Sequence, residues 1–245
     1  MRIARPRTHH ALSGCTIAVS GVWGQADAAS AAGDVAGTGE LGDVLGEAGA
    51  DVVQIRTPAD LRRAVERAGL GRVDAVLFPS SSASWVTTAE SAGVLDANRR
   101  RAATGRLILF ARDEGEAARL HAARLPARSA EQPTATALVR GVLAHYGSGV
   151  ASLPTDVGRL EVRSGGVVVD ERFIPLSPGA TGIIEALFLA RGRVLSRAEL
   201  GRSLPGRRSG RAVEVAVARL REALDRRELV QTVVKRGYRL AVAEE

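Results

Sequence analysis

Apolar runs in the first 147 residues alternate with segments of helical pattern, and this alternation limits the possible folds most strongly. Strands that alternate with helices predict a parallel sheet with helices on both faces, a flavodoxin-like α/β architecture. The predicted strands are Thr16–Ser20, Asp51–Arg56, Val73–Phe78 and Leu107–Ala111, with a weaker fifth near Ala127–Ala130. The predicted helices are Gly39–Ala48, Ala59–Ala68, Ser84–Arg101, Glu114–Leu125 and Thr134–Tyr146. The stretch Gly24–Gly37 has no clear period, which indicates disorder or an eroded element.

The pattern changes at the segment GSGVASLPT, residues 147–155. Its glycine, serine and proline content is typical of a connector between domains. We therefore expect an α/β domain over residues 1–147, a linker over 148–156 and a second domain over 157–245. In the second domain, short strands separated by turns predict an antiparallel meander, followed by three helices and a closing hairpin.

The three helices of the second domain have clear start signals. Ser177 precedes Pro178, a residue that suits the first position of a helix. Ser196 and Glu199 have the spacing of a capping box. The third helix is predicted to run from Ser209 to Asp225.

The third helix has two different faces. One is a narrow apolar stripe, and the other, about 120° away, is charged with a small residue in it. Such a charged face suits the DNA major groove, because short side chains allow close approach and guanidinium groups reach phosphates or guanine. An ordinary amphipathic surface helix would give the same pattern, so the helix alone leaves both interpretations open. The apolar stripe is Val213, Val217, Leu220 and Leu224, and the charged face is Arg211, Glu214, Ala218 and Arg221.

The last segment, RRELVQTVVKRGYRLAV, predicts a hairpin with a basic tip. Its strands are Val230–Val234 and Tyr238–Val242, and Gly237 supplies the backbone freedom of a short turn. We expect Tyr238 to face the core. Lys235 and Arg236 would then lie at the tip, where a wing can contact phosphates or a minor groove.

Positive charge is concentrated in the second domain. Residues 191–239 contain 14 basic and 5 acidic side chains, whereas residues 1–156 contain 17 and 16. A local excess of this kind favours a surface that meets phosphates. A solvated, arginine-rich face is the alternative explanation of the charge alone.

Residues 157–243 resemble the winged-helix DNA-binding domain of the OmpR/PhoB group of regulators. The motifs are LSPGATGIIEAL, GRVLSRAEL, RAVEVAVARLREAL and VQTVVKRGYRL, in the order and spacing of that family. The resemblance implies binding of double-stranded DNA as a homodimer, and contact with a partner regulator or RNA polymerase. It places Arg211, Glu214, Ala216, Ala218, Arg219 and Arg221 at DNA-facing positions, and Thr232 on a strand that contacts the DNA backbone.

Two departures from the family pattern affect this site. Ala216 stands where the family often has histidine, which removes one contact. Val234 replaces an arginine that commonly enters the minor groove, and the positive charge lies instead at Lys235 and Arg236. We therefore add these two residues to the predicted DNA-binding set.

The N-terminal part is similar to the uroporphyrinogen-III synthase family. The segments that carry the similarity are LSGCTIAVSGVWG, ELGDVLGEAGADVVQIRTPAD, VDAVLFPSSSASWVTTAESAG and PTATALVRGVLAHY. They cover about half of that two-lobed family, so a cleft between lobes is not expected and synthase activity is not predicted. The chain is therefore expected not to be an enzyme. A tetrapyrrole enzyme with an accessory DNA-binding domain is the alternative.

The N-terminal domain also lacks the residues of a phosphoreceiver. Its first predicted strand ends in Ser20-Gly21 and its third in Pro79-Ser80, where a receiver needs acidic residues to bind Mg²⁺. A receiver also needs a lysine at the end of its fifth strand, and none stands there, because Lys235 in the second domain is the only lysine in the chain. We predict a sensing or dimerising domain that is not phosphorylated on aspartate, with an atypical receiver as another possibility.

The remaining signals are weak. Ser80, Ser81 and Ser82 lie between a strand and a helix, where helix capping alone explains them; hydroxyl and N–H groups that hold an anion are the less favoured alternative. Cys15 is the only cysteine, and no clustered His/Cys spacing predicts a metal site or a cofactor. No apolar run is long enough to cross a membrane, and no signal peptide is evident, which predicts a cytoplasmic protein.

Overall fold

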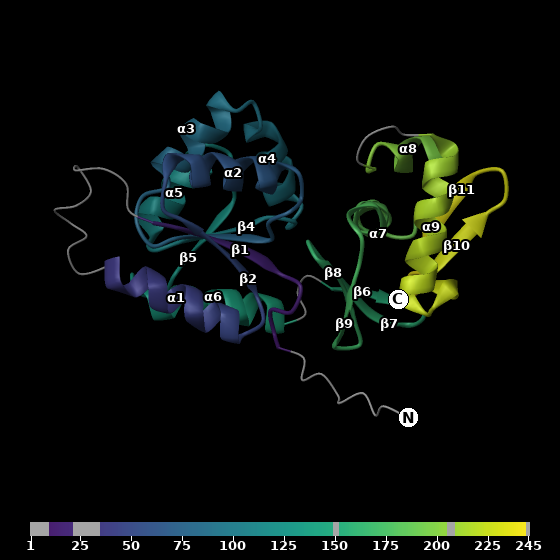
Figure 1. Ribbon diagram of the computed structural model, residues 1–245, viewed down its shortest axis with the longest axis horizontal. Helices are drawn as coiled ribbons and strands as arrows, with labels where there is room; N and C mark the ends of the chain where they lie inside the picture. The colour runs from purple at the N-terminus through teal and green to yellow at the C-terminus, as the bar shows by residue number, and fades with distance from the viewer. Residues whose placement is uncertain (1–9, 22–34, 149–151, 205–208, 244–245) are drawn as a thin grey trace.

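The computed structural model describes residues 10–21, 35–148, 152–204 and 209–243, which form two domains (Figure 1). In the N-terminal domain, five strands form a fully parallel sheet in the order β2-β1-β3-β4-β5. This order confirms the predicted flavodoxin-like fold class, and the sheet includes the fifth strand, for which the sequence pattern was weak. The strands are β1 (Thr16–Ser20), β2 (Asp51–Ile55), β3 (Ala75–Phe78), β4 (Ile108–Ala111) and β5 (Ala127–Ser129).

Helices cover both faces of this sheet. Helices α1 (Val35–Glu47) and α6 (Ala135–Gly147) lie on one face, where Leu45 and Val142 belong to the same buried cluster (Figure 1). The other face carries the remaining helices, whose apolar sides form a second cluster with β3 and β4. These helices are α2 (Pro58–Gly69), α3 (Ala83–Ser91), α4 (Leu95–Ala103) and α5 (Glu114–Ala122).

The structure corrects one helix prediction. The single helix expected over Ser84–Arg101 is two helices, α3 and α4, separated at residues 92–94. Gly93 has a φ of +69°, in the left-handed region that ends helices, and this interrupts the helical hydrogen bonding. The prediction for Gly24–Gly37 lies mostly outside the described residues, although its last three residues begin α1.

The C-terminal domain has the α+β winged-helix architecture expected from the sequence. Four antiparallel strands in sequential order form its first sheet: β6 (Ser152–Thr155), β7 (Gly158–Arg163), β8 (Gly166–Val169) and β9 (Arg172–Pro175). Three helices follow: α7 (Pro178–Ala190), α8 (Arg197–Gly201) and α9 (Gly210–Leu224). A single turn of 3-10 helix at Arg227–Leu229 leads to the hairpin β10 (Val230–Val233) and β11 (Gly237–Leu240).

The segment expected to be a linker contains a strand. Ser152–Thr155 pairs with β7 as the edge strand β6, and Leu153 is buried in the core of the C-terminal domain. The sequence SLPT gave no signal for this, because its side chains are small and a proline stands inside it; an edge strand tolerates that proline. None of the helices within the described ranges is long and apolar enough to cross a bilayer.

Candidate nucleic-acid interface

Helix α9 is fixed at both ends by its own sequence. The hydroxyl of Ser209 accepts a hydrogen bond from the backbone N–H of Ala212, as an N-cap does. At the other end, Asp225 adopts a left-handed conformation with a φ of +51° and stops the helix. The predicted start, end and apolar stripe of this helix are all confirmed, since Val213, Val217, Leu220 and Leu224 are buried.

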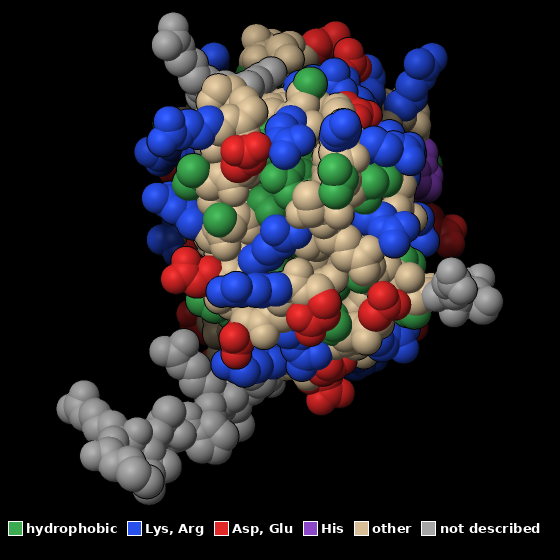
Figure 2. All heavy atoms as spheres, turned by 90° about the vertical axis from the view of Figure 1, so that its right-hand side faces the viewer, with side chains coloured by type: hydrophobic (Ala, Val, Ile, Leu, Met, Phe, Trp, Pro, Cys, Tyr) green, Lys and Arg blue, Asp and Glu red, His purple; other side chains and the backbone are tan. Residues whose placement is uncertain are grey.

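The exposed face of α9 carries most of the predicted DNA-facing side chains. Arg211, Glu214, Ala218 and Arg219 are exposed on it. Figure 2 shows the end of the molecule that carries α9 and the hairpin; arginine and lysine side chains are spread over it, with hydrophobic side chains between them. This surface combines exposed arginines with the short side chain of Ala218.

Ala216 does not belong to that face. It is 9% exposed and packs in the core cluster of the C-terminal domain, so the prediction that it faces DNA is wrong. The reason is geometric: the apolar side of α9 is wider than the single stripe read from the sequence. Ala216 follows Val213 by three residues and precedes Leu220 by four, which places it on the buried side.

Arg221 is held by the hairpin. Its Nε and Nη2 atoms donate to the carbonyl oxygen of Val230 at 2.9 and 2.5 Å, and Nη2 also donates to the hydroxyl of Thr232 at 2.9 Å. Its guanidinium carbon lies 5.8 Å from the centre of the Tyr238 ring. The structure thus brings Arg221 and Thr232 together, and it gives Arg221 a role in joining α9 to the hairpin, beside any contact with DNA.

A second arginine reaches this surface from α8. Arg197 Nε lies 2.9 Å from Glu214 Oε1, and its guanidinium carbon lies 5.5 Å from the centre of the Tyr238 ring. Arg197 therefore fixes the direction of an acidic side chain on α9. Sequence reasoning missed it, because Arg197 and Glu214 are 17 residues apart and the capping box was the only signal around it.

The hairpin forms the expected wing, with a different turn. Residues 234–236 connect the strands, and the N–H of Arg236 donates to the carbonyl oxygen of Val233 at 3.0 Å. Within the turn, Lys235 takes the left-handed conformation with a φ of +61°. Val234, Lys235 and Arg236 are all exposed, and Val234 is 78% exposed at the tip. The predicted basic tip is therefore accessible.

Gly237 serves a purpose that the sequence did not reveal. It is the first residue of β11, with a φ of +139°. A Cβ atom there would lie 2.0 Å from the carbonyl oxygen of Leu195, because Leu195 and Tyr238 exchange backbone hydrogen bonds of 2.8 and 2.9 Å. Gly237 thus allows the segment before α8 to join the wing.

The serine segment, Ser80 to Ser82, contacts a carboxylate of the same chain. Glu116 Oε1 accepts from the backbone N–H of Ser82 at 2.6 Å and from its hydroxyl at 2.5 Å, and both residues are buried. The hydroxyl of Ser81 accepts from the N–H of Ala83 at 3.2 Å. Ser82 is therefore not available to an external anion; it stands at the N-cap position of α3 without a side-chain capping bond, and its polar groups bond to Glu116 instead. Ser80 is half-buried and has no such contact among the described residues.

The described ranges of the chain contain no group of three His, Cys, Asp or Glu side chains that could hold a metal ion. Cys15 is buried, and burial raises the pKa of its thiol far above the usual value. The negative charge of Asp74 acts in the same direction. The thiol is therefore protonated at neutral pH and unreactive as a nucleophile.

Residues 170–240 match the family model described as "Transcriptional regulatory protein, C terminal". The match spans β9, the three helices and the wing. The C-terminal domain is therefore a winged-helix DNA-binding domain of the OmpR/PhoB type, as the motifs predicted. The chain thus contains the DNA-binding domain of a transcription regulator.

Comparison with solved structures adds three distant likenesses. The DNA-binding domain of the response regulator AdeR, in complex with an intercistronic region, is 22% identical over 34% of this chain and 95% of its own, with a TM-score of 0.32. The response regulator DrrB of Thermotoga maritima, an OmpR/PhoB homologue, is 18% identical over 93% and 99%, with a TM-score of 0.33. A 2-hydroxyisobutyryl-CoA ligase is 12% identical over 77% and 32%, with a TM-score of 0.35. No curated protein matches the chain.

Proposed function

We propose that this chain is a sequence-specific DNA-binding transcription regulator in which α9 enters the major groove and the wing contacts the backbone or minor groove. The observation that carries the proposal is that one end of the molecule presents three groups together. They are the exposed arginines of α9, the carboxylate of Glu214 held by Arg197, and the basic wing tip at residues 234–236. Arginine forks suit guanine and phosphate, and a carboxylate suits the amino group of cytosine.

The N-terminal domain, in this proposal, senses or dimerises and is not phosphorylated on aspartate. In a receiver, the phosphorylated aspartate follows the third strand, and here β3 is followed by Pro79 and Ser80. The described residues of the N-terminal domain form one five-stranded sheet, which supports a single lobe of the kind suggested by the sequence similarity to uroporphyrinogen-III synthase. Within the described residues, no second α/β lobe lies beside this one to enclose a tetrapyrrole, and we propose a regulator rather than an enzyme. We propose that the protein acts as a homodimer on adjacent half-sites and meets a partner regulator or RNA polymerase there.

Salt dependence of DNA binding tests the role of α9. We expect Arg211→Ala and Arg219→Ala each to weaken binding to a selected duplex and to lower the slope of log K against log salt by about one, for one lost phosphate contact. Arg140→Ala is the matched control, because Arg140 is exposed on α6 of the other domain. Unchanged affinity and slope for both α9 variants would overturn the assignment of this face to DNA.

Sequencing of the duplexes that the protein retains from a random pool would test specificity. Enrichment of a defined motif is expected, and a two-fold repeat in it would support a dimer. Retention without any enriched motif would contradict sequence-specific recognition.

A further inference from the structure

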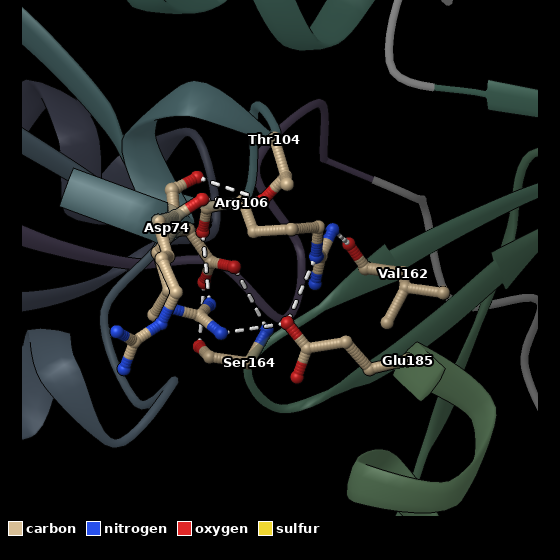
Figure 3. A network of polar contacts seen from close by, with 8 residues as sticks. Asp74, Thr104, Arg106, Val162, Ser164 and Glu185 are labelled. Carbon is tan, nitrogen blue, oxygen red and sulfur yellow. Dashed lines mark hydrogen bonds and ion pairs between the residues drawn. The ribbon is translucent and has the colours of Figure 1, made fainter. Parts of the chain in front are cut away.

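The two domains meet at the edge of the parallel sheet where strands β1, β3 and β4 begin. The turn between β7 and β8 enters this edge, and Ser164 at its tip binds Asp74, the residue before β3 (Figure 3). Asp74 Oδ1 accepts from the N–H of Ser164 at 2.9 Å, and Oδ2 accepts from its hydroxyl at 2.5 Å. Oδ2 also accepts from the N–H of Thr16 at 2.8 Å. Asp74 is buried, so one carboxylate joins the turn between β7 and β8 of the C-terminal sheet to the N-terminal core.

Arginines of the N-terminal domain make a second set of contacts. Arg106 donates to the carbonyl oxygen of Val162 at 2.5 Å and lies 3.1 Å from Glu185 of α7 (Figure 3). Arg101 of α4 lies 2.6 Å from the same oxygen of Glu185. Each of these three charged side chains is at most 16% exposed, so the charges are paired away from solvent. Buried pairs of this kind fix geometry because each group left unpaired is costly.

Close backbone contact completes the interface. The N–H of Gly165 donates to the carbonyl oxygen of Gly14 at 3.0 Å, and Arg163 donates to the carbonyl oxygen of Ser13 at 2.7 Å. A Cβ atom on Gly14 would lie 2.0 Å from a ring carbon of Phe173. We call this set of contacts, centred on Asp74, Arg106, Ser164 and Glu185, the domain clamp.

The domain clamp leaves the DNA-binding face uncovered. Helix α9 packs on α7 and α8, and Figure 1 places α9 and the hairpin at the end of the molecule away from the parallel sheet. Among the described residues, the side-chain bonds of α9 go to Arg197 and to the hairpin, both within the C-terminal domain. Closure of the clamp and exposure of Arg211 and Arg219 therefore coexist in one structure.

The clamp also lies opposite the usual ligand edge. It occupies the edge where the strands begin, whereas ligands of open α/β sheets bind outside the carboxyl ends of the strands. A ligand at the carboxyl edge would not have to displace the C-terminal domain.

We propose that the clamp stays closed when the protein binds DNA, so that binding requires no release of the C-terminal domain from the N-terminal domain. This inference rests on the proposed DNA-binding function and concerns its regulation. Control by an effector would then act on the joined pair of domains, for example by changing how two copies meet, and not by uncovering α9.

A reversible lock tests the proposal. The hydroxyls of Thr16 and Ser164 are 3.0 Å apart, so a Thr16→Cys, Ser164→Cys pair in a Cys15→Ala background can form a disulfide across the clamp under oxidised glutathione. We expect the oxidised and reduced forms to bind the selected duplex with dissociation constants within about twofold of each other. If oxidation weakens the affinity for the duplex tenfold or more, and reduction restores it, the proposal is overturned.

A variant with a weakened clamp tests the same proposal without a disulfide. Glu185→Ala removes the shared partner of Arg101 and Arg106. If binding needs no release, its affinity for the duplex stays within about twofold of wild type; a rise of tenfold or more would show that the clamp restrains binding. Glu66→Ala is the control, since it makes the same change of charge and breaks an exposed pair with Arg62 on α2, outside the interface.

The two proposals fail in different ways. If the wild-type protein binds no duplex in the random pool, the proposed function itself fails and the inference falls with it. If the wild type binds and only the locked form does not, the function stands and the closed-clamp inference alone is wrong.

Discussion

Arg221 of α9 donates two hydrogen bonds to the carbonyl oxygen of Val230, which ties α9 to the first strand of the wing. Arg219, two residues earlier, is exposed. Of these two arginines of one helix, Arg221 bonds within the domain and Arg219 lies on its surface.

This difference predicts that alanine at position 221 lowers stability, whereas alanine at position 219 lowers DNA affinity. Arg221→Ala should lower the free energy of unfolding by about 1–3 kcal/mol, because the buried oxygen of Val230 loses its partner. Arg219→Ala should change that free energy by less than about 0.5 kcal/mol and should act on DNA affinity instead. Urea unfolding followed by circular dichroism measures the first effect. Equal stability of the two variants would show that the contact between Arg221 and Val230 contributes nothing.

Glu116 is expected to matter for the stability of the N-terminal domain. Glu116→Ala leaves the buried N–H and hydroxyl of Ser82 without their acceptor, which should cost about 1–3 kcal/mol. Glu116→Gln keeps an acceptor oxygen and should cost less. Glu90→Gln, an exposed position on α3, serves as control and should leave the unfolding midpoint in place. A Glu116→Ala protein as stable as wild type would show that the contact between Glu116 and Ser82 contributes nothing to stability.

His145 predicts a pH dependence of stability. Burial, together with the charge of Arg128, lowers the pKa of His145 from 6.5 to about 4, and neither ring nitrogen has a hydrogen-bond partner among the described residues. Below pH 6.5, His145 is protonated in the unfolded chain but stays neutral in the folded protein. The free energy of unfolding therefore falls as the pH is lowered from about 6.5 to 4. His145→Phe should reduce this fall, and urea unfolding at pH 7 and pH 5 would measure it. An NMR titration of the imidazole near pH 6.5 in the folded protein would contradict the prediction.

Two glycine variants should shift stability in opposite directions. Gly237→Ala brings a methyl group against the carbonyl oxygen of Leu195 at a positive φ, and we expect a loss of about 2 kcal/mol or more. Gly46 lies in α1 with nothing near its missing Cβ, so Gly46→Ala should gain about 0.5–1 kcal/mol. Thermal unfolding of both proteins tests the pair. A Gly237→Ala protein of normal stability would mean that the wing and the segment before α8 do not meet as described.

The parts predicted correctly from sequence are those that depend on neighbours along the chain. Ser209 and Ser196 signal helix starts because a cap bonds to a residue three positions ahead, and the stripe from Val213 to Leu224 follows from helical periodicity. The failures depend on neighbours elsewhere. Ala216 is buried because the core against α9 is wide, and Arg221 bonds to a strand nine residues away.

The domain clamp was beyond prediction for the same reason. Asp74 and Ser164 are 90 residues apart and lie in different domains, and the similarity segment that contains Asp74 gives no sign of a partner in the other domain. No periodicity or local signal relates such a pair. The strand β6 inside the expected linker was missed likewise, because it is a strand only through its pairing with β7.

The strand β6 also determines where the chain can be divided. Thr155 bridges Val242, and the N–H of Ala243 donates to the carbonyl oxygen of Pro154 at 3.3 Å, so the start and the end of the C-terminal domain lie side by side. A gene fragment that begins at residue 157 would omit this strand, strip Leu153 from the core and leave the edge of β7 unpaired. Unpaired edges recruit other chains, so aggregation of that shorter product is to be expected. Expression of the winged helix alone therefore calls for a start at or before Ser152.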